Sequence, residues 1–143
     1  MIDKTAKQYD LDPALVEAII AVESSGRANA YRYEPNFFKQ YLAANPRYAA
    51  TNPERTSASY GLMQILYSTA VQLGFAGDPE YLFVPSVNVQ LGCAYLAKMF
   101  KRAEGDLRQA VARYNGGGNW QAPGPQLYAD RVIDRMEAMR AQA

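Results

Sequence analysis

Histidine is absent from this sequence of 143 residues, and cysteine occurs once, as Cys93. Without histidine there is no Ser-His or Cys-His catalytic pair and no histidine-based zinc site. A single cysteine excludes an internal disulfide bond. The sequence also contains no glycine-rich phosphate loop and no carboxylate spacing typical of a calcium loop, so we expect neither a metal nor a cofactor. Any chemistry must therefore use carboxylates, tyrosines, amides and the backbone.

Charge of one sign and long apolar runs are also missing. The formal net charge is +1, which argues against nucleic-acid binding and against strong attraction to a membrane surface. No apolar run approaches the roughly 20 residues that a membrane-spanning helix needs. The first ten residues lack the apolar core of a signal peptide. Three interpretations stay open: the chain remains in the cytosol, leaves by another route, or derives from a longer protein.

The pattern of apolar residues predicts a mainly α protein with a single domain spanning residues 1–143. This length is enough for one substantial core, and nearly half of the residues are apolar. Alternating strand-like patterns of any length are absent, whereas helical periodicity recurs between Gly and Pro residues. The predicted helices cover residues 2–9, 13–24, 35–44, 68–73, 85–103, 106–114 and 126–140. Ser68 is the predicted N-cap of the fourth helix, and residues 45–56 are predicted to have little regular structure.

Glu23 lies on the apolar side of the helix predicted over residues 13–24. At about 100° per residue, its side chain falls between those of Ile19 and Val16, whereas Glu17 projects from the polar side. Apolar surroundings and the negative end of a helix dipole both raise the pKa of a carboxyl group. Such a group stays protonated near neutral pH and can act as a general acid. The sequence thus makes Glu23 the candidate catalytic residue.

Helical geometry alone leaves another interpretation of Glu23 open. A carboxylate at the end of a helix commonly reaches water, or pairs with a cation at position i+4, which here is Arg27. The chain also contains 11 tyrosines. Tyrosine combines a ring that packs with a hydroxyl that binds polar ligands, so it suits both sugar-binding clefts and ordinary core edges. Tyr114 is the tyrosine most suggestive of a site, because it directly precedes an Asn-Gly-Gly-Gly turn.

Three separated segments resemble the soluble lytic transglycosylase (SLT) domain family, which is related to goose-type lysozymes. Residues 22–30, Val-Glu-Ser-Ser-Gly-Arg-Ala-Asn-Ala, resemble its Glu-Ser block. Residues 59–65, Ser-Tyr-Gly-Leu-Met-Gln-Ile, resemble its Gly-Leu-Met-Gln block, and residues 111–117, Val-Ala-Arg-Tyr-Asn-Gly-Gly, its Ala-Tyr-Asn-Ala-Gly block. Residues 82–96 look like the connecting helix of the family, and residues 128–132 look like its closing segment. The resemblance covers about residues 8 to 135.

This resemblance implies a lysozyme-like, largely helical fold and a lyase that degrades bacterial cell walls. The family cleaves the β-1,4 bond between N-acetylmuramic acid and N-acetylglucosamine in peptidoglycan. By that likeness, Glu23 protonates the glycosidic oxygen and then acts as the base when the C6 hydroxyl of muramic acid attacks C1. The product is a 1,6-anhydro sugar, and one protein carboxylate suffices where most glycosidases need two. We expect a monomer that acts in the periplasm, outside the cell, or after delivery by a phage, as an endolysin does.

The resemblance also assigns substrate-binding roles to particular residues. Gln64 is implied to be an amide that binds the substrate, Met63 and Ile65 support the cleft floor, and Tyr114 borders the catalytic carboxyl. Ser24 and Ser25 either orient the catalytic segment or serve only as hydrogen-bonding groups at the helix end. The full set of implied substrate-binding residues is Ser24, Ser25, Met63, Gln64, Ile65, Tyr114, Asn115 and Tyr128.

The chain departs from the family pattern in three places. Tyr60 replaces a small residue before the Gly-Leu-Met-Gln block, and Leu66 stands where methionine is common. An insert over residues 31–38, Tyr-Arg-Tyr-Glu-Pro-Asn-Phe-Phe, looks like the Arg-Phe-Glu-Pro segment of some phage and bacterial muramidases. Glu34 of this insert is either a second carboxylate of the cleft or the partner of Arg32 or another arginine at the surface.

These departures keep two other functions open. An N-acetylmuramidase of the goose-lysozyme kind would cleave the same bond with water as the acceptor, and Glu34 could then position that water. A non-catalytic module that binds peptidoglycan is a further alternative. Binding alone does not require an acid on an apolar helix face, so Glu23, Gln64 and Tyr114 together favour an enzyme.

Overall fold

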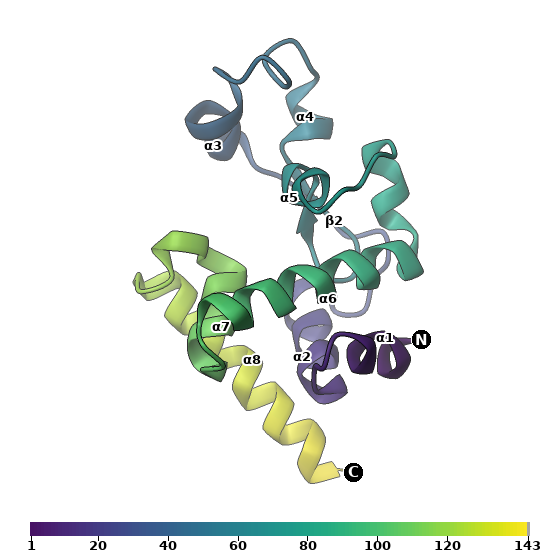
Figure 1. Ribbon diagram of the computed structural model, residues 1–143, viewed down its shortest axis with the longest axis vertical. Coiled ribbons are helices and arrows are strands. Elements are labelled where there is room, and N and C mark those ends of the chain that lie inside the picture. The colour runs from purple at the N-terminus through teal and green to yellow at the C-terminus, as the bar shows by residue number, and fades with distance from the viewer. Residues whose placement is uncertain (143) are drawn as a thin grey trace.

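The structure, a computed structural model that describes residues 1–142, is built mainly from helices with one small sheet (Figure 1). The α-helices are α1 (Ile2–Gln8), α2 (Pro13–Ser24), α3 (Pro35–Phe37), α4 (Pro53–Thr56), α5 (Tyr67–Gln72), α6 (Pro85–Arg102), α7 (Leu107–Gly116) and α8 (Pro123–Gln142). A π-helix, η1 (Phe38–Leu42), follows α3, and two 3₁₀-helices are η2 (Pro79–Phe83) and η3 (Gly117–Asn119). The strands are β1 (Tyr31–Tyr33), β2 (Ala58–Tyr60) and β3 (Ile65–Leu66). The predicted mainly α class is confirmed.

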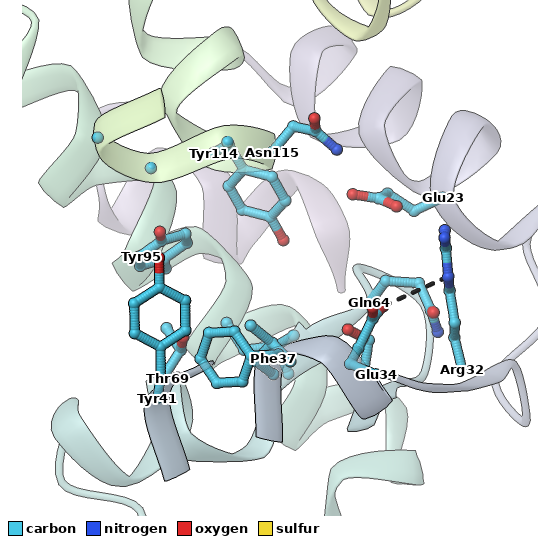
Figure 2. Close-up of a pocket in the computed structure, with 16 residues that line it drawn as sticks. Glu23, Arg32, Glu34, Phe37, Tyr41, Gln64, Thr69, Tyr95, Tyr114 and Asn115 are labelled. Atoms are coloured by element: carbon cyan, nitrogen blue, oxygen red, sulfur yellow. Dashed lines mark ion pairs between the residues drawn. The ribbon is translucent and has the colours of Figure 1, made fainter. Parts of the chain in front are cut away.

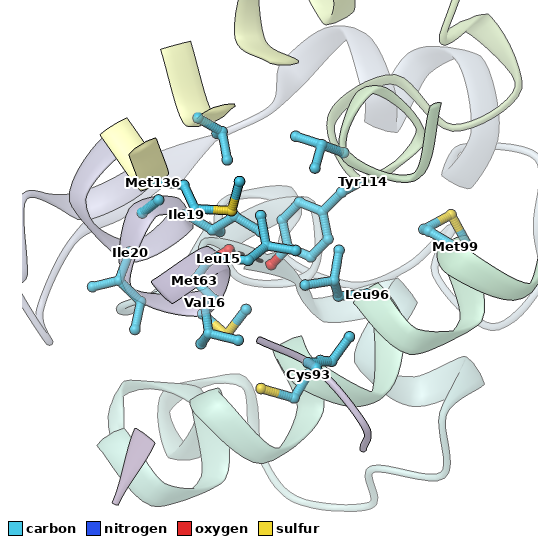
Figure 3. Packing of buried hydrophobic residues seen from close by; sticks show 14 of the residues in the cluster. Leu15, Val16, Ile19, Ile20, Met63, Cys93, Leu96, Met99, Tyr114 and Met136 are labelled. Atoms are coloured by element: carbon cyan, nitrogen blue, oxygen red, sulfur yellow. Dashed lines mark hydrogen bonds between the residues drawn. The ribbon is translucent and has the colours of Figure 1, made fainter. Parts of the chain in front are cut away.

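Helices α1, α2, α6, α7 and α8 form one part of the molecule, which we call the helical lobe (Figure 1). Within it, α2 packs on α8, α8 on α7, and α7 on α6. Their apolar faces meet in the main core, which excludes water from most of its side chains (Figure 3). The fully or almost fully buried members include Leu15, Val16, Ile19, Met63, Cys93, Leu96, Met99, Val111 and Met136. Burial of this apolar surface is the main force that holds the lobe together.

Helix α2 begins and ends where its sequence predicts. The side chain of Asp12 accepts a hydrogen bond from the Ala14 backbone N–H at 2.9 Å, and Pro13 fills the first turn. Ser25 ends the helix in the left-handed conformation, with φ of 54°. Glu23 is therefore in the last turn of a helix whose opposite end is capped and whose inner face is buried.

The remaining elements form a second part, the sheet lobe, which comprises β1–β3, α3, η1, α4, α5 and η2. The sheet is antiparallel in the order β1-β2-β3, with Tyr31 opposite Tyr60 and Ser59 opposite Leu66. A second, smaller core lies beneath it, formed by Ala58, Tyr60, Ile65, Ala70 and Leu82. The strands have three, three and two residues, which is too short for an alternating pattern to be recognised in the sequence.

Asn88 on α6 connects the two lobes through hydrogen bonds of its side chain. Its side chain is completely buried, and its Nδ2 donates to the backbone oxygens of Tyr60 and Leu82 at 2.7 and 2.8 Å. Its Oδ1 accepts from the backbone N–H of Met63 at 2.8 Å. Three backbone groups of the sheet lobe thus find their partner on a helix of the helical lobe. A buried amide with all its bonds satisfied fixes the turn after β2 against α6.

Two glycines allow this close approach. A Cβ atom at Gly61 would lie 2.4 Å from Asn88 Nδ2, and the φ of Gly61 is +75°. A Cβ atom at Gly92 would lie 2.3 Å from Met63 Sδ. The turn that carries Leu62, Met63 and Gln64 therefore rests directly on the backbone of α6.

Several predicted boundaries differ from the structure. The helix predicted over residues 35–44 is a short α-turn followed by a π-helix, and residues 45–56 include α4. Ser68 lies inside α5, whose N-cap position is Leu66, so the predicted cap is wrong. Helix α7 continues to Gly116, two residues beyond its predicted end. Helix α8 covers Pro123–Gln142 and so begins within the segment of Pro and Gly residues that we expected to be a loop. No helix within residues 1–142 has the length and apolarity to cross a membrane.

Candidate active site

A cleft with a volume of about 480 Å³ lies between the two lobes (Figure 2). This volume is within the range of small-molecule binding sites. The lining residues are Glu23, Arg32, Glu34, Phe37, Tyr41, Ser59, Gln64, Ile65, Leu66, Thr69, Tyr95, Tyr114, Asn115, Gly116, Gly117 and Gly118. Figure 2 shows the charged groups gathered at one end of the cleft, near Gln64, and three aromatic rings at the other.

Glu23 reaches the cleft from the last turn of α2. Burial raises the pKa of its carboxyl group from 4.5 to about 7, and the negative charge of Glu34 adds to this rise. The hydroxyl of Tyr128 on α8 donates to Glu23 Oε2 at 3.0 Å and acts in the opposite direction, as does the charge of Arg32. Burial outweighs both, so the Glu23 carboxyl group keeps its proton to higher pH than an ordinary glutamic acid does. The predicted direction of the pKa shift is confirmed.

The alternative in which Glu23 pairs with Arg27 is not what the structure contains. Arg27 is exposed, and its Nε donates to the backbone oxygen of Ser24 at 3.2 Å. Its guanidinium group thereby supports the C-terminal end of α2, where backbone oxygens carry partial negative charge. The Glu23 carboxyl group therefore bonds to the Tyr128 hydroxyl and lines the cleft.

Glu34 and Arg32 occupy the wall that faces Glu23 (Figure 2). Arg32 Nε lies 3.3 Å from Glu34 Oε1, and the Glu34 side chain is 31% exposed. Glu34 is therefore both a lining residue of the cleft and the ion-pair partner of Arg32. A role of Glu34 as a second carboxylate in the reaction stays a prediction. Among residues 1–142, no group of three or more Cys, Asp or Glu side chains is placed to hold a metal ion.

Gln64 projects from the turn that Asn88 holds. Its φ is +50°, an uncommon conformation for a residue with a side chain. Its Nε2 donates to the backbone oxygens of Ala30 and Gly61, each at 3.1 Å. These bonds fix the amide group of Gln64 in the lining of the cleft.

Tyr114 and Asn115 line the cleft from the last turns of α7. The Tyr114 hydroxyl donates to the backbone oxygen of Met63 at 2.7 Å, and burial raises its pKa well above 10. A neutral ring that is anchored in this way forms a fixed wall beside Glu23. Asn115 is exposed, and the glycines that follow it continue the wall.

Four of the residues implied by the resemblance lie outside the lining of the cleft. The Ser24 hydroxyl donates to the backbone oxygens of Ile20 and Leu62, which attaches α2 to the sheet lobe. Ser25 is exposed at the helix end and borders a shallow groove between α2 and α8. Met63 is buried against Gly92 beneath the cleft. Tyr128 is buried behind Glu23 and contacts it through its hydroxyl.

The lining of the cleft also includes side chains that the sequence did not single out as site residues, among them Phe37, Tyr41, Thr69 and Tyr95. The rings of Phe37 and Tyr41 lie 4.9 Å apart. Their signal in the sequence was two aromatic residues four positions apart, shortly after the Glu-Pro of the insert. Leu42 next to them does pack inward and is buried.

The chain is similar to known proteins of one family. The model of the family described as Transglycosylase SLT domain matches residues 1–122. A protein named Transglycosylase from Enterobacteria phage PRD1 is 31% identical over 143 residues, which is 96% of this chain and 42% of the relative. Membrane-bound lytic murein transglycosylase C from Edwardsiella ictaluri is 30% identical over 131 residues, covering 82% of this chain and 30% of the relative.

A solved structure has the same fold. It is the X-ray structure of an inactive mutant of Lytic Transglycosylase Slt from Pseudomonas aeruginosa, which matches with a TM-score of 0.68 and 21% sequence identity. The match covers 94% of this chain and 22% of that chain. The chain thus spans less than half the length of each of these three proteins.

Proposed function

Because the chain belongs to the Transglycosylase SLT domain family, we propose that it is a peptidoglycan lytic transglycosylase. It cleaves the β-1,4 bond between N-acetylmuramic acid and N-acetylglucosamine and forms 1,6-anhydro-N-acetylmuramic acid. Glu23 is the general acid and base of this reaction. Support comes from the curated relatives, two of which are named as a transglycosylase and a lytic murein transglycosylase.

The observation that carries the proposal is the state of Glu23. A carboxyl group with a pKa of about 7 is protonated often enough to act as an acid at neutral pH. Its conjugate base is then basic enough to take the proton back, which a carboxylate of ordinary pKa does poorly. The Tyr128 hydroxyl donates to Glu23 Oε2 at 3.0 Å, which leaves the other carboxyl oxygen to carry the proton.

The proposed reaction needs one carboxyl group and conserves all atoms. Glu23 gives its proton to the glycosidic oxygen as the bond from that oxygen to C1 of muramic acid breaks, with assistance from the N-acetyl group of the same sugar. The C6 hydroxyl then attacks C1, and its proton returns to Glu23. Because the attacking group belongs to the substrate, its proximity replaces the capture of an external water.

The remaining lining residues hold the substrate in this proposal. Gln64 Oε1 accepts a hydrogen bond from a sugar N–H or O–H group, and Ile65 and Asn115 border the reacting sugars. Tyr114, Met63 and Ser24 contribute by holding the walls, because their polar contacts are made within the protein. Tyr128 positions Glu23, and Ser25 serves the end of α2.

One observation favours a second function, hydrolysis by an N-acetylmuramidase. Glu34 lines the same cleft and faces Glu23, and two carboxyl groups across a sugar are the usual arrangement for attack by water. The ion pair of Glu34 with Arg32 opposes this role, because a paired carboxylate is a weaker base. We therefore propose the transglycosylase as the main activity.

The partner of the protein in this proposal is the glycan strand of bacterial peptidoglycan. Contact with it requires the periplasm, the outside of the cell, or delivery by a phage. The residues that we place at the site come from one chain, so a monomer suffices, and residues 1–143 are proposed to act as one SLT domain.

Mass spectrometry of the fragments released from purified peptidoglycan tests the proposed reaction. Anhydro products are lighter by one water than hydrolytic products, and we expect them with the intact protein and not with Glu23→Gln. Reducing products of the hydrolytic mass would replace the transglycosylase with a muramidase. Release of no fragment by the intact protein would contradict both activities.

A further inference from the structure

The end of the cleft away from Glu23 is built from aromatic rings. Phe37 and Tyr41 come from α3 and η1, with ring centroids 4.9 Å apart and planes tilted by 45°. Tyr95 comes from α6, and its ring lies 5.3 Å from that of Tyr114. Figure 2 shows Tyr41, Phe37 and Tyr95 together at this end, with Thr69 beside them. Tyr114 lies between this group and Glu23 in the same view.

Tyr41 stands on the π-helix η1, which directly follows α3 and Phe37. The backbone N–H of Ala43 donates to the oxygen of Phe38, five residues earlier, at 2.8 Å. The rings of Phe37 and Tyr41, four positions apart, have their centroids 4.9 Å apart, and Leu42 beside them is buried. Single π-turns are rare and occur frequently at functional sites. Tyr41 is 59% exposed, so its ring has little protein packed against it and offers its apolar face to a ligand.

The hydroxyl groups at this end are also available. Tyr60, Tyr114 and Tyr128 each donate a hydrogen bond to another protein group. By contrast, within residues 1–142 the hydroxyls of Tyr41 and Tyr95 make no hydrogen bond. A ring with a free apolar face and a free hydroxyl can bind a ligand that has both an apolar face and polar edges.

The distribution of charge in the cleft limits the kind of ligand that the aromatic end can bind. The charged lining residues, Glu23, Arg32 and Glu34, are all at the other end of the cleft (Figure 2). The aromatic end contains only neutral side chains, so it offers no ion pair to a phosphate, a carboxylate or an amine. A pyranose ring fits these properties, because one face presents C–H groups and the edges carry hydroxyls.

We infer that Phe37, Tyr41 and Tyr95 form a sugar-binding subsite, separate from the reacting bond, for an N-acetylhexosamine ring of the strand that Glu23 cleaves. This inference rests on the proposed function for the identity of the strand. The ring stacks on Tyr41, and its hydroxyls bond to the tyrosine hydroxyls and Thr69. A strand that reaches from Glu23 to this subsite binds more tightly than a short fragment, so the enzyme prefers long glycans.

Calorimetric titration with an oligosaccharide tests the subsite without any bond cleavage. Proteins that all carry Glu23→Gln are titrated with the β-1,4-linked hexamer of N-acetylglucosamine. We expect Tyr41→Ala to weaken binding about tenfold, whereas Tyr41→Phe, which keeps the ring, weakens it by about twofold to threefold. Tyr81→Ala is the matched control, since Tyr81 is also 59% exposed but lies outside the cleft, and binding should not change.

A second measurement uses the protein with Glu23 intact. On soluble glycan strands, Tyr41→Ala should raise KM about tenfold and leave kcat within about twofold, because the lost contact is remote from the reacting atoms. Melting temperatures of all variants identify any loss from unfolding. Equal hexamer binding by Tyr41→Ala and Tyr81→Ala would overturn the subsite, even if strands were cleaved. Binding that depends on Tyr41 without cleavage would overturn the proposed function and retain the subsite.

Discussion

The two ends of the cleft are held by different kinds of structure. At the polar end, Glu23 stands on a 12-residue helix and is fixed by Tyr128, while Gln64 stands on a turn that Asn88 secures with three buried hydrogen bonds. At the aromatic end, Tyr41 stands on a five-residue π-helix, and its ring centroid lies 4.9 Å from that of Phe37. The side chains of the polar end are thus held by hydrogen bonds, whereas Tyr41 at the aromatic end lies at the surface.

This difference follows from what each end is proposed to do. Proton transfer needs a carboxyl group placed within a fraction of an ångström. Accordingly, Tyr128 bonds to Glu23, and the nearby Gln64 and Tyr114 side chains bond to the backbone. Stacking on a sugar needs only an apolar surface of the right orientation, and it tolerates small movements. The polar end also holds a carboxyl group in surroundings that disfavour its charge, which the aromatic end does not. Substitutions should therefore affect the two ends very differently.

The largest expected effect is the loss of activity in Glu23→Gln. The amide keeps the shape of the side chain and removes the proton donor, so the rate of glycan cleavage should fall about 10³-fold. Release of labelled fragments from peptidoglycan measures this rate. Glu17→Gln is the matched control, because Glu17 is exposed on the same helix, and its activity should equal that of the wild type. A loss in Glu34→Gln as large as that in Glu23→Gln would give Glu34 an essential role.

Asn88→Ala should cause the largest loss of stability. It leaves the Met63 N–H and the Tyr60 and Leu82 oxygens buried without partners, and we expect a loss of about 3–4 kcal/mol in the free energy of unfolding. Chemical denaturation measures it. Gln90→Ala, on the same helix, removes one half-buried bond to Tyr9 and should cost about 1 kcal/mol. Tyr41→Ala at the aromatic end should change stability by less than about 0.5 kcal/mol. Equal losses in all three variants would refute the contrast between the ends.

Stability should also depend on pH through Glu23. Its pKa is 4.5 in an ordinary setting and about 7 in the folded protein. Because the folded value is higher, the protonated group favours folding below about pH 4.5, and this contribution is lost as the pH rises through about 7. We expect the free energy of unfolding to fall by about 3 kcal/mol across this window in excess of the change in Glu23→Gln. Denaturation curves of both proteins at several pH values provide the measurement. Parallel curves would mean that Glu23 is not buried as described.

The helices that carry the acid could be predicted from the sequence because they are long and periodic. Helix α2 has a capping aspartate, a proline in its first turn and an apolar stripe, and its predicted bounds are those observed. Helix α6 has the same kind of stripe. In such segments, local preference and packing agree, so the position of Glu23 relative to the core followed from the sequence alone.

The sheet lobe could not be predicted in the same way, because its structure depends on contacts between distant residues. Strands of two or three residues have no usable pattern in the sequence. The bond from Tyr128 to Glu23 joins residues 105 positions apart. Asn88 did leave a signal, a polar residue beside the apolar stripe of α6, but its three backbone partners are set only by the fold.

Tyr128→Phe should have the smallest effect of these changes, and it tests whether the fixed geometry of the polar end tunes the acid. The hydroxyl of Tyr128 donates to Glu23 Oε2 and lowers its pKa, so its removal should raise the pKa above about 7. Glu23 would then keep its proton to higher pH, and the alkaline limb of the pH–activity profile should shift to higher pH. The dependence of kcat/KM on pH measures this shift. Tyr114→Phe is the control, because the Tyr114 hydroxyl donates to the Met63 backbone oxygen and not to Glu23. In this variant kcat/KM should fall, and the pH of the alkaline limb should not change. A shift of the alkaline limb to lower pH in Tyr128→Phe would show that the hydroxyl stabilises the protonated form of Glu23.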